Sequence, residues 1–174
     1  MPTTSGLLHN SPTEEMLPEV PVAMNFDEIL SNLIVGSCPR DRSDIEWLKR
    51  NLGITAVLSL QTDHDLAQWD IDWEAMESAY QTSGLQIRRV PVKDFNANDL
   101  ERKLPACVKT LDELLRADHT VYVHCTAGMN RSPSAVVAYL HRVRGMDLDE
   151  AMEFVMEKHH CEPYIDAIQF AEWE

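Results

Sequence analysis

Apolar residues alternate along the chain between short continuous runs and longer stretches with helical spacing. The short runs lie at 33–36, 54–60, 86–92 and 121–124 and predict strands. The run 54–60 has little polar interruption, as expected for a strand covered on both faces. Helical spacing is found in six stretches: 43–51, 72–82, 99–115, 132–144, 148–160 and 163–173. The stretch 61–72 is polar and is expected to be irregular. Strands that alternate with helices predict a single α/β domain with a mainly parallel sheet flanked by helices.

Length and charge limit the classes of function. The 174 residues suit one domain, which we expect over 24–174, preceded by a flexible acidic tail over 1–23. No apolar run approaches the roughly 20 residues of a membrane span. The formal net charge of −14 argues against nucleic acid and against docking on an anionic membrane, because both need a basic face.

The stretch TVYVHCTAGMNRSPS, residues 120–134, combines a short strand, a loop and the start of an apolar helix. Loop N–H groups beside a helix N-terminus form a cradle for an oxyanion. Arg131 adds a planar fork that can bind two phosphate oxygens. We therefore expect a bound phosphate to contact Thr126, Ala127, Gly128, Met129, Asn130 and Arg131. Cys125 at the start of this positive loop is expected to be a thiolate nucleophile, which predicts catalysis through a cysteinyl phosphate.

Cleavage of a phosphate ester also needs a carboxylic acid that protonates the leaving oxygen. Asp94 and Asp99 both precede the helix predicted at 99–115. Asp99 is interpreted as the N-cap of that helix. Asp94 has no such local role and follows a strand, so it is the predicted general acid. We expect Ser132 to hydrogen-bond the departing thiolate, and His124 to support the loop from behind.

Two other groups of residues are interpreted as structural. His159, His160 and Cys161 lie together at a helix end, where the helix dipole by itself favours histidine. Cys38, Cys107 and Cys161 show neither the spacing of a zinc site nor that of a disulfide framework. We expect them to be small packing groups in a reducing compartment, and we expect no bound metal or cofactor.

The pattern H-C-x-x-G-x-x-R-S, which begins at His124, resembles the signature of cysteine-dependent phosphatases of the dual-specificity class. Segments that precede it in the chain, among them LIVGSC, LQTDHDLAQWDID and RRVPVKDF, resemble the starch-excess and like-starch-excess glucan phosphatases of plants and, more distantly, laforin. The resemblance covers about 24–170 and implies the cysteine-phosphatase fold. It also implies that Lys93, Asp94 and Phe95 belong to the loop that carries the general acid.

This resemblance implies in addition that three aromatic residues, Phe26, Trp69 and Phe95, line a channel for a glucan chain. A flat apolar ring offers the C–H faces of a sugar a large and rigid contact. The chain departs from the plant pattern at Asn130, where glycine is usual, and at Ser132, where alanine is frequent. The R-S-P ending is closer to phosphatases that act on proteins.

The leading hypothesis is therefore a phosphatase that acts on phosphorylated glucan of the starch or glycogen type. The alternative is a dual-specificity protein phosphatase that acts on phosphotyrosine, phosphoserine and phosphothreonine, and a third candidate is a catalytically silent binding module. We expect a monomer whose partner is the phosphorylated glucan or phosphoprotein substrate. The predicted compartment is the cytoplasm, with the plastid as the alternative.

Overall fold

The computed structural model describes residues 24–174, and the tail predicted over 1–23 lies outside the described residues. The strands are β1 (Phe26–Leu30), β2 (Leu33–Gly36), β3 (Ala56–Ser59), β4 (Gln86–Arg89) and β5 (Val121–His124). The helices are α1 (Arg42–Leu52), α2 (Asp63–Gln68), α3 (Trp73–Thr82), α4 (Ala97–Arg116), α5 (Arg131–Arg142), α6 (Leu148–Lys158) and α7 (Ile165–Phe170). No helix in this part of the chain is long and apolar enough to cross a membrane.

The strands form one sheet in the order β1-β2-β5-β3-β4. β2, β5, β3 and β4 are parallel, and β1 pairs with β2 in the antiparallel direction at the edge. The prediction of a mainly parallel sheet is thus confirmed. β1 was not predicted as a strand, because Asp27 and Glu28 interrupt its apolar pattern. An edge strand tolerates such charged residues.

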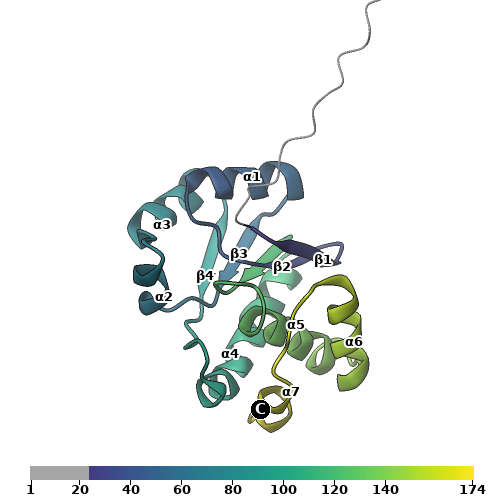
Figure 1. Cartoon of the computed structure of the whole chain (residues 1–174). Coiled ribbons are helices and arrows are strands. Elements are labelled where there is room, and N and C mark those ends of the chain that lie inside the picture. Colours follow the sequence, from purple (N-terminus) through teal and green to yellow (C-terminus); the bar gives the residue numbers. More distant parts are fainter. Residues whose placement is uncertain (1–23) are drawn as a thin grey trace, which may run out of the picture.

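Helices cover both faces of the sheet (Figure 1). Tyr122 of β5 faces the side of α1 and α3, where it joins a core cluster with Ile45, Leu48 and Tyr80. Its neighbours Val121 and Val123 face the other side, where α4, α5, α6 and α7 pack. This alternation follows from the two-residue period of a strand. α5 is buried at every position from Arg131 to Leu140, which agrees with the apolar helix predicted after the loop.

Two local predictions are wrong. The stretch 61–72 is not irregular throughout, because α2 forms there with a capping box in which Thr62 and Asp65 bond each other's backbone N–H groups. Asp99 is not an N-cap, since α4 begins earlier and Asn96 caps it by accepting from the Asp99 N–H. The buried Asp99 carboxylate instead accepts a hydrogen bond from the Lys93 N–H (2.8 Å) and so anchors the loop before α4.

The carboxyl ends of parallel strands meet at one edge of a sheet. Here that edge brings together the end of β5 with Cys125, the turn after β2 and the loops after β3 and β4. The predicted nucleophile, arginine and general acid all belong to these connections.

Candidate active site

The nucleophile predicted at Cys125 follows directly after β5 and is 3% exposed. Its Sγ lies 3.2 Å from the Ser132 hydroxyl, which comes from the first turn of α5. Its surroundings are therefore not purely apolar. Burial raises the pKa of Cys38 to about 11, of Cys107 to about 12 and of Cys161 to about 11, so these three thiols are protonated at neutral pH.

The backbone carbonyl groups of the phosphate loop, residues 125–130, are turned away from its centre. Each carbonyl oxygen from Cys125 to Met129 accepts a hydrogen bond from outside the loop. The donors to the carbonyls of residues 125, 126, 127, 128 and 129 are, in that order, His124 Nδ1 (2.8 Å), Cys38 N (3.0 Å), Asn25 Nδ2 (3.3 Å), His159 Nε2 (2.7 Å) and Glu162 N (2.7 Å). In a trans peptide the C=O and the next N–H point in opposite directions. Carbonyls held outward therefore direct the N–H groups of residues 126–130 inward, which is the arrangement that an oxyanion requires.

Gly128 is the one position of this loop where only glycine fits. Its φ is +72°, and a Cβ there would lie 2.6 Å from the carbonyl carbon of Gly36 and 2.7 Å from the nitrogen of Ser37. The phosphate loop thus packs directly against the backbone of the turn after β2. Asn130, the departure from the plant pattern, donates from its side chain to the carbonyl of Glu162 (2.8 Å), which glycine could not do.

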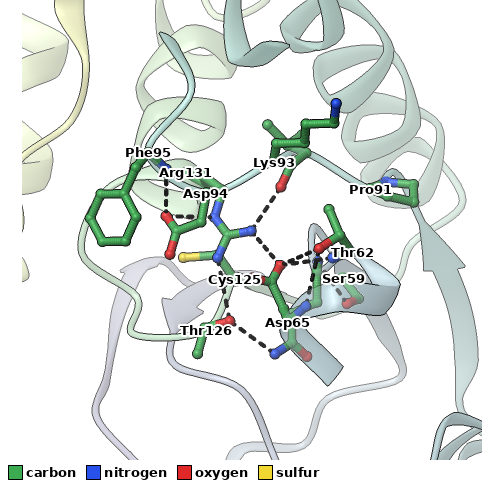
Figure 2. Close-up of polar contacts among 12 residues, drawn as sticks. Ser59, Thr62, Asp65, Pro91, Lys93, Asp94, Phe95, Cys125, Thr126 and Arg131 are labelled. Carbon is green, nitrogen blue, oxygen red and sulfur yellow. Dashed lines mark hydrogen bonds and ion pairs between the residues drawn. The ribbon is translucent and has the colours of Figure 1, made fainter. Parts of the chain in front are cut away.

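The guanidinium of Arg131 is buried and held by one of its nitrogens. Nη1 donates to Asp65 Oδ2 (2.6 Å) and to the carbonyl of Val92 (2.7 Å). On the opposite edge, Nη2 makes a longer contact to Thr126 Oγ1 (3.3 Å), and Nε lies 3.4 Å from Asp94 Oδ1 without a hydrogen bond (Figure 2). The Nε–Nη2 edge is the one that a bidentate oxyanion ligand uses, so Asp65 and Val92 fix the fork in a productive orientation.

Asp65 was not among the site residues predicted from the sequence. Burial raises the pKa of its carboxyl group, but hydrogen bonds from Arg131 and Thr62 outweigh burial and hold that pKa below its usual range. Asp65 is therefore ionised and balances the buried charge of Arg131. The T-x-x-D capping signal could have located the residue on a helix, but its pairing with an arginine 66 residues further along needed the tertiary structure.

Asp94 lies in the loop between β4 and α4, with its side chain 34% exposed. Its Oδ1 accepts from the Phe95 N–H (3.1 Å) and approaches Arg131 Nε. Lys93, which directly precedes Asp94, is held in place because its N–H donates to the Asp99 carboxylate. Of the two carboxylates considered from the sequence, Asp94 is the one that reaches the mouth of the phosphate loop, while Asp99 is buried in a structural role.

His124 is buried behind the loop, as expected for a supporting group. Burial lowers its pKa to about 4, the nearby charge of Arg131 acts in the same direction, and the contact with the carbonyl of Cys125 opposes both. The ring is therefore neutral at physiological pH. A neutral ring that donates from Nδ1 leaves Nε2 unprotonated, and Nε2 has no hydrogen-bond partner among the residues that the structure describes.

The three aromatic residues predicted to bind glucan have different surroundings. Phe95 is 99% exposed beside Asp94 and lines a cavity of about 490 Å³ between α2 and the loop that precedes α4. Trp69 is 46% exposed at the end of α2, and the guanidinium carbon of Arg40 lies 4.8 Å from its ring centroid. Phe26 is half-buried against Trp47, with ring centroids 5.4 Å apart. The role of all three stays a prediction.

His159 has a position that the sequence did not indicate. It was interpreted as a helix-end residue, and it does follow α6 as its C-cap. Its ring, however, is buried between Asp27 of β1 and the carbonyl of Gly128 in the phosphate loop. These partners are 132 and 31 residues away along the chain, so no local pattern could have revealed the contacts.

Several known proteins are similar in sequence to most of this chain. The phosphoglucan phosphatase LSF1, chloroplastic, of Arabidopsis thaliana is 38% identical over 153 residues, which cover 88% of this chain and 26% of that protein. The phosphoglucan phosphatase DSP4, amyloplastic, of Castanea sativa is 36% identical over 86% of this chain and 40% of that protein. Laforin of Mus musculus is 37% identical over 83% of this chain and 46% of that protein. The chain thus spans less than half the length of these relatives.

Solved structures support the fold. PTPMT1 superimposes with a TM-score of 0.67 at 18% identity, over 84% of this chain and 90% of that one. Human DUSP28 superimposes with a TM-score of 0.64 at 23% identity, over 90% and 95%. The family model for the dual specificity phosphatase catalytic domain matches residues 35–168, a range that contains the phosphate loop, Arg131, Asp65 and Asp94. The chain therefore belongs to the dual specificity phosphatase catalytic domain family.

Proposed function

We propose that this protein is a metal-independent phosphatase that hydrolyses phosphate monoesters on a glucan of the starch or glycogen type. The observation that carries the chemistry is the position of Cys125 beneath a loop whose carbonyl groups are all held outward, beside the fork of Arg131. Such a loop concentrates N–H donors and one guanidinium on a phosphate group, and it places sulfur behind the phosphorus atom.

In the first step, the Cys125 thiolate attacks phosphorus, and a P–S bond forms as the P–O bond to the sugar breaks. Asp94, in its protonated form, gives its proton to the departing sugar oxygen. The phosphoryl oxygens are bound by the loop N–H groups and by the Nε–Nη2 edge of Arg131. Because Asp94 lies 3.4 Å from Arg131 Nε, a phosphate bound there meets the general acid directly.

In the second step, water attacks the phosphocysteine, a new P–O bond forms, and the P–S bond breaks. Asp94, now a carboxylate, takes the proton from water. The electron pair returns to sulfur, where the Ser132 hydroxyl at 3.2 Å can donate a hydrogen bond to the thiolate. Inorganic phosphate then leaves, and the starting protonation states are restored.

The choice of glucan rests on the relatives and on the rim of the site. Two of them carry the name phosphoglucan phosphatase, and the identity to them, 38% and 36%, exceeds the 29% to human dual specificity protein phosphatase 9. Phe95 lines the cavity beside Asp94 with an exposed ring, and Trp69 exposes its ring at the end of α2, next to Gln68, which also lines the cavity. The same plant relatives are described as chloroplastic and amyloplastic, which favours a plastid over the cytoplasm.

The test compares phosphate release from phosphorylated amylopectin, from a phosphotyrosine peptide and from p-nitrophenyl phosphate. Cys125→Ser is expected to abolish turnover of all three. Trp69→Ala and Phe95→Ala are each expected to lower kcat/KM on amylopectin about fivefold to tenfold, the value of an aromatic contact of about 1–1.5 kcal/mol, and to leave p-nitrophenyl phosphate unchanged.

Phe170→Ala is the matched control, because Phe170 is an exposed ring (63%) on α7, away from the cavity. Equal losses on amylopectin in all three aromatic variants would remove the glucan channel from the proposal. Faster turnover of the peptide than of amylopectin by the wild type would favour a protein phosphatase instead. Turnover by Cys125→Ser would show that the nucleophile is a different residue.

A further inference from the structure

His159 is a buried, titratable residue that the proposed reaction does not use. Its ring is 3% exposed, and each ring nitrogen faces an oxygen at short range. Nδ1 lies 2.7 Å from Oδ2 of Asp27 on β1, and Nε2 lies 2.7 Å from the carbonyl oxygen of Gly128. The ring therefore connects the edge strand of the sheet to the middle of the phosphate loop.

The two partners define how many protons the ring carries. A carboxylate and a carbonyl oxygen only accept hydrogen bonds, so each contact at 2.7 Å needs an N–H on the histidine side. A neutral imidazole has one N–H and could serve only one of the two. The doubly protonated imidazolium serves both, and the Asp27 carboxylate balances its charge.

The contact with Gly128 has a direct consequence for the cradle. A carbonyl of Gly128 that is held outward directs the N–H of Met129 toward the phosphate site. The same segment after α6 donates from the Glu162 N–H to the carbonyl of Met129, and Asn130 bonds back to the carbonyl of Glu162. The half of the loop nearest Arg131 is thus held by residues 159–162, and His159 makes the only charge-assisted contact among those that the structure describes here.

We propose that His159, as an imidazolium held by Asp27, is a positioning residue that orients the Gly128–Met129 peptide for oxyanion binding. This inference rests on the proposed phosphatase function, because it assigns a role within the same site. It predicts that oxyanion affinity depends on the protonation of a ring that never touches the substrate. As pH rises and the ring loses a proton, one of the two contacts is lost and the loop binds phosphate less well.

Within residues 24–174, the His159 ring bonds one carboxylate and one backbone carbonyl. Asp27 on β1 favours the protonated ring, whereas the phosphate loop presents only a carbonyl. Cys161, whose thiol donates to the backbone carbonyl of His159, has a pKa raised to about 11 by burial and by the Asp27 charge, so it is neutral below that pH.

The experiment measures the inhibition constant of tungstate, a tetrahedral oxyanion, against p-nitrophenyl phosphate hydrolysis over a range of pH. His159→Gln is expected to weaken tungstate binding about tenfold near neutral pH, the loss of one charge-assisted hydrogen bond. Asp27→Asn keeps the imidazole and its Gly128 contact but removes the group that holds the proton. In the Asp27→Asn variant, tungstate affinity is expected to fall at a lower pH than in the wild type. His160→Gln, at the exposed neighbouring position, is the control and is expected to match the wild type.

A second measurement does not depend on turnover. Nitrogen-15 NMR of the ring distinguishes a doubly protonated from a singly protonated imidazole, and the wild type is expected to show two N–H groups on His159 near pH 7. A singly protonated ring, or tungstate affinity in both His159→Gln and Asp27→Asn equal to that of the wild type, would overturn the inference. If His159→Gln does not fold, the Asp27→Asn profile and the NMR signal decide. A wild type that cleaves no phosphate ester would instead refute the proposed function, and the NMR result would still stand by itself.

Discussion

The neutral, buried ring of His124 predicts a specific loss of stability in acid. The unfolded chain binds a proton at this ring below its ordinary pKa of 6.5, while burial holds the pKa in the folded protein at about 4. The folded state therefore has its full stability above pH 6.5 and loses it as the pH falls toward 4. Below about pH 4 the folded protein also binds the proton, so the loss stops growing.

The size of the loss follows from the two pKa values. Lowering the pKa from 6.5 to about 4 corresponds to about 3–4 kcal/mol in total, of which about 2 kcal/mol is already lost near pH 5. This is a large fraction of the total stability of a domain of this size, commonly about 5–15 kcal/mol. Asp65, whose pKa is lowered, adds its own loss only when the pH falls through the ordinary range of a carboxyl group.

The assay is urea unfolding followed by tryptophan fluorescence between about pH 7 and pH 4, for the wild type and for His124→Asn. The variant is expected to be less stable at pH 7, because it alters a buried site, but its stability should fall by about 2 kcal/mol less than that of the wild type between pH 7 and pH 5. His160→Gln serves as the matched control, since that ring is exposed. Parallel pH profiles for the wild type and His124→Asn would refute the reasoning.

Three further substitutions test the site. Asp65→Asn removes the buried ionic partner of Arg131 and leaves only the longer contact with Asp94, so it should lower the free energy of unfolding by about 3 kcal/mol and raise KM. A loss below about 1 kcal/mol in a urea titration would contradict the pairing. Gly128→Ala should reduce kcat/KM more than tenfold, because the added Cβ would clash with the backbone of Gly36 and Ser37. Gly145→Ala is the control and should keep full activity in the same assay, since Gly145 has the same φ of +72° but no described atom lies within 4 Å of the added Cβ. Ser132→Ala should slow hydrolysis of the phosphocysteine about tenfold, which would be seen as a burst of product before a slower steady state. A reduced kcat without a burst would place the role of Ser132 in the first step.

The sequence by itself determined the elements that build the site and the residue types in it. Periodicity located β2, β3, β4 and β5 and the central helix α5, because strands and helices of a layered domain carry their own apolar pattern. The strand, loop and helix around Cys125 follow one another in the chain, so their cradle was predicted from local information. Asp94 was selected because it had no local role.

Only the tertiary structure decided what holds this cradle in shape. β1 escaped prediction because an edge strand needs no continuous apolar run. Asp99 was misplaced because the partners of its buried carboxylate, Lys93 and Lys103, do not mark it in the sequence. Asp65 and His159 reach the site from α2 and from the end of α6, across 66 and 31 residues of chain. Hydrogen bonds between such distant residues depend on how the elements pack against each other, and helical or strand periodicity carries no record of that packing.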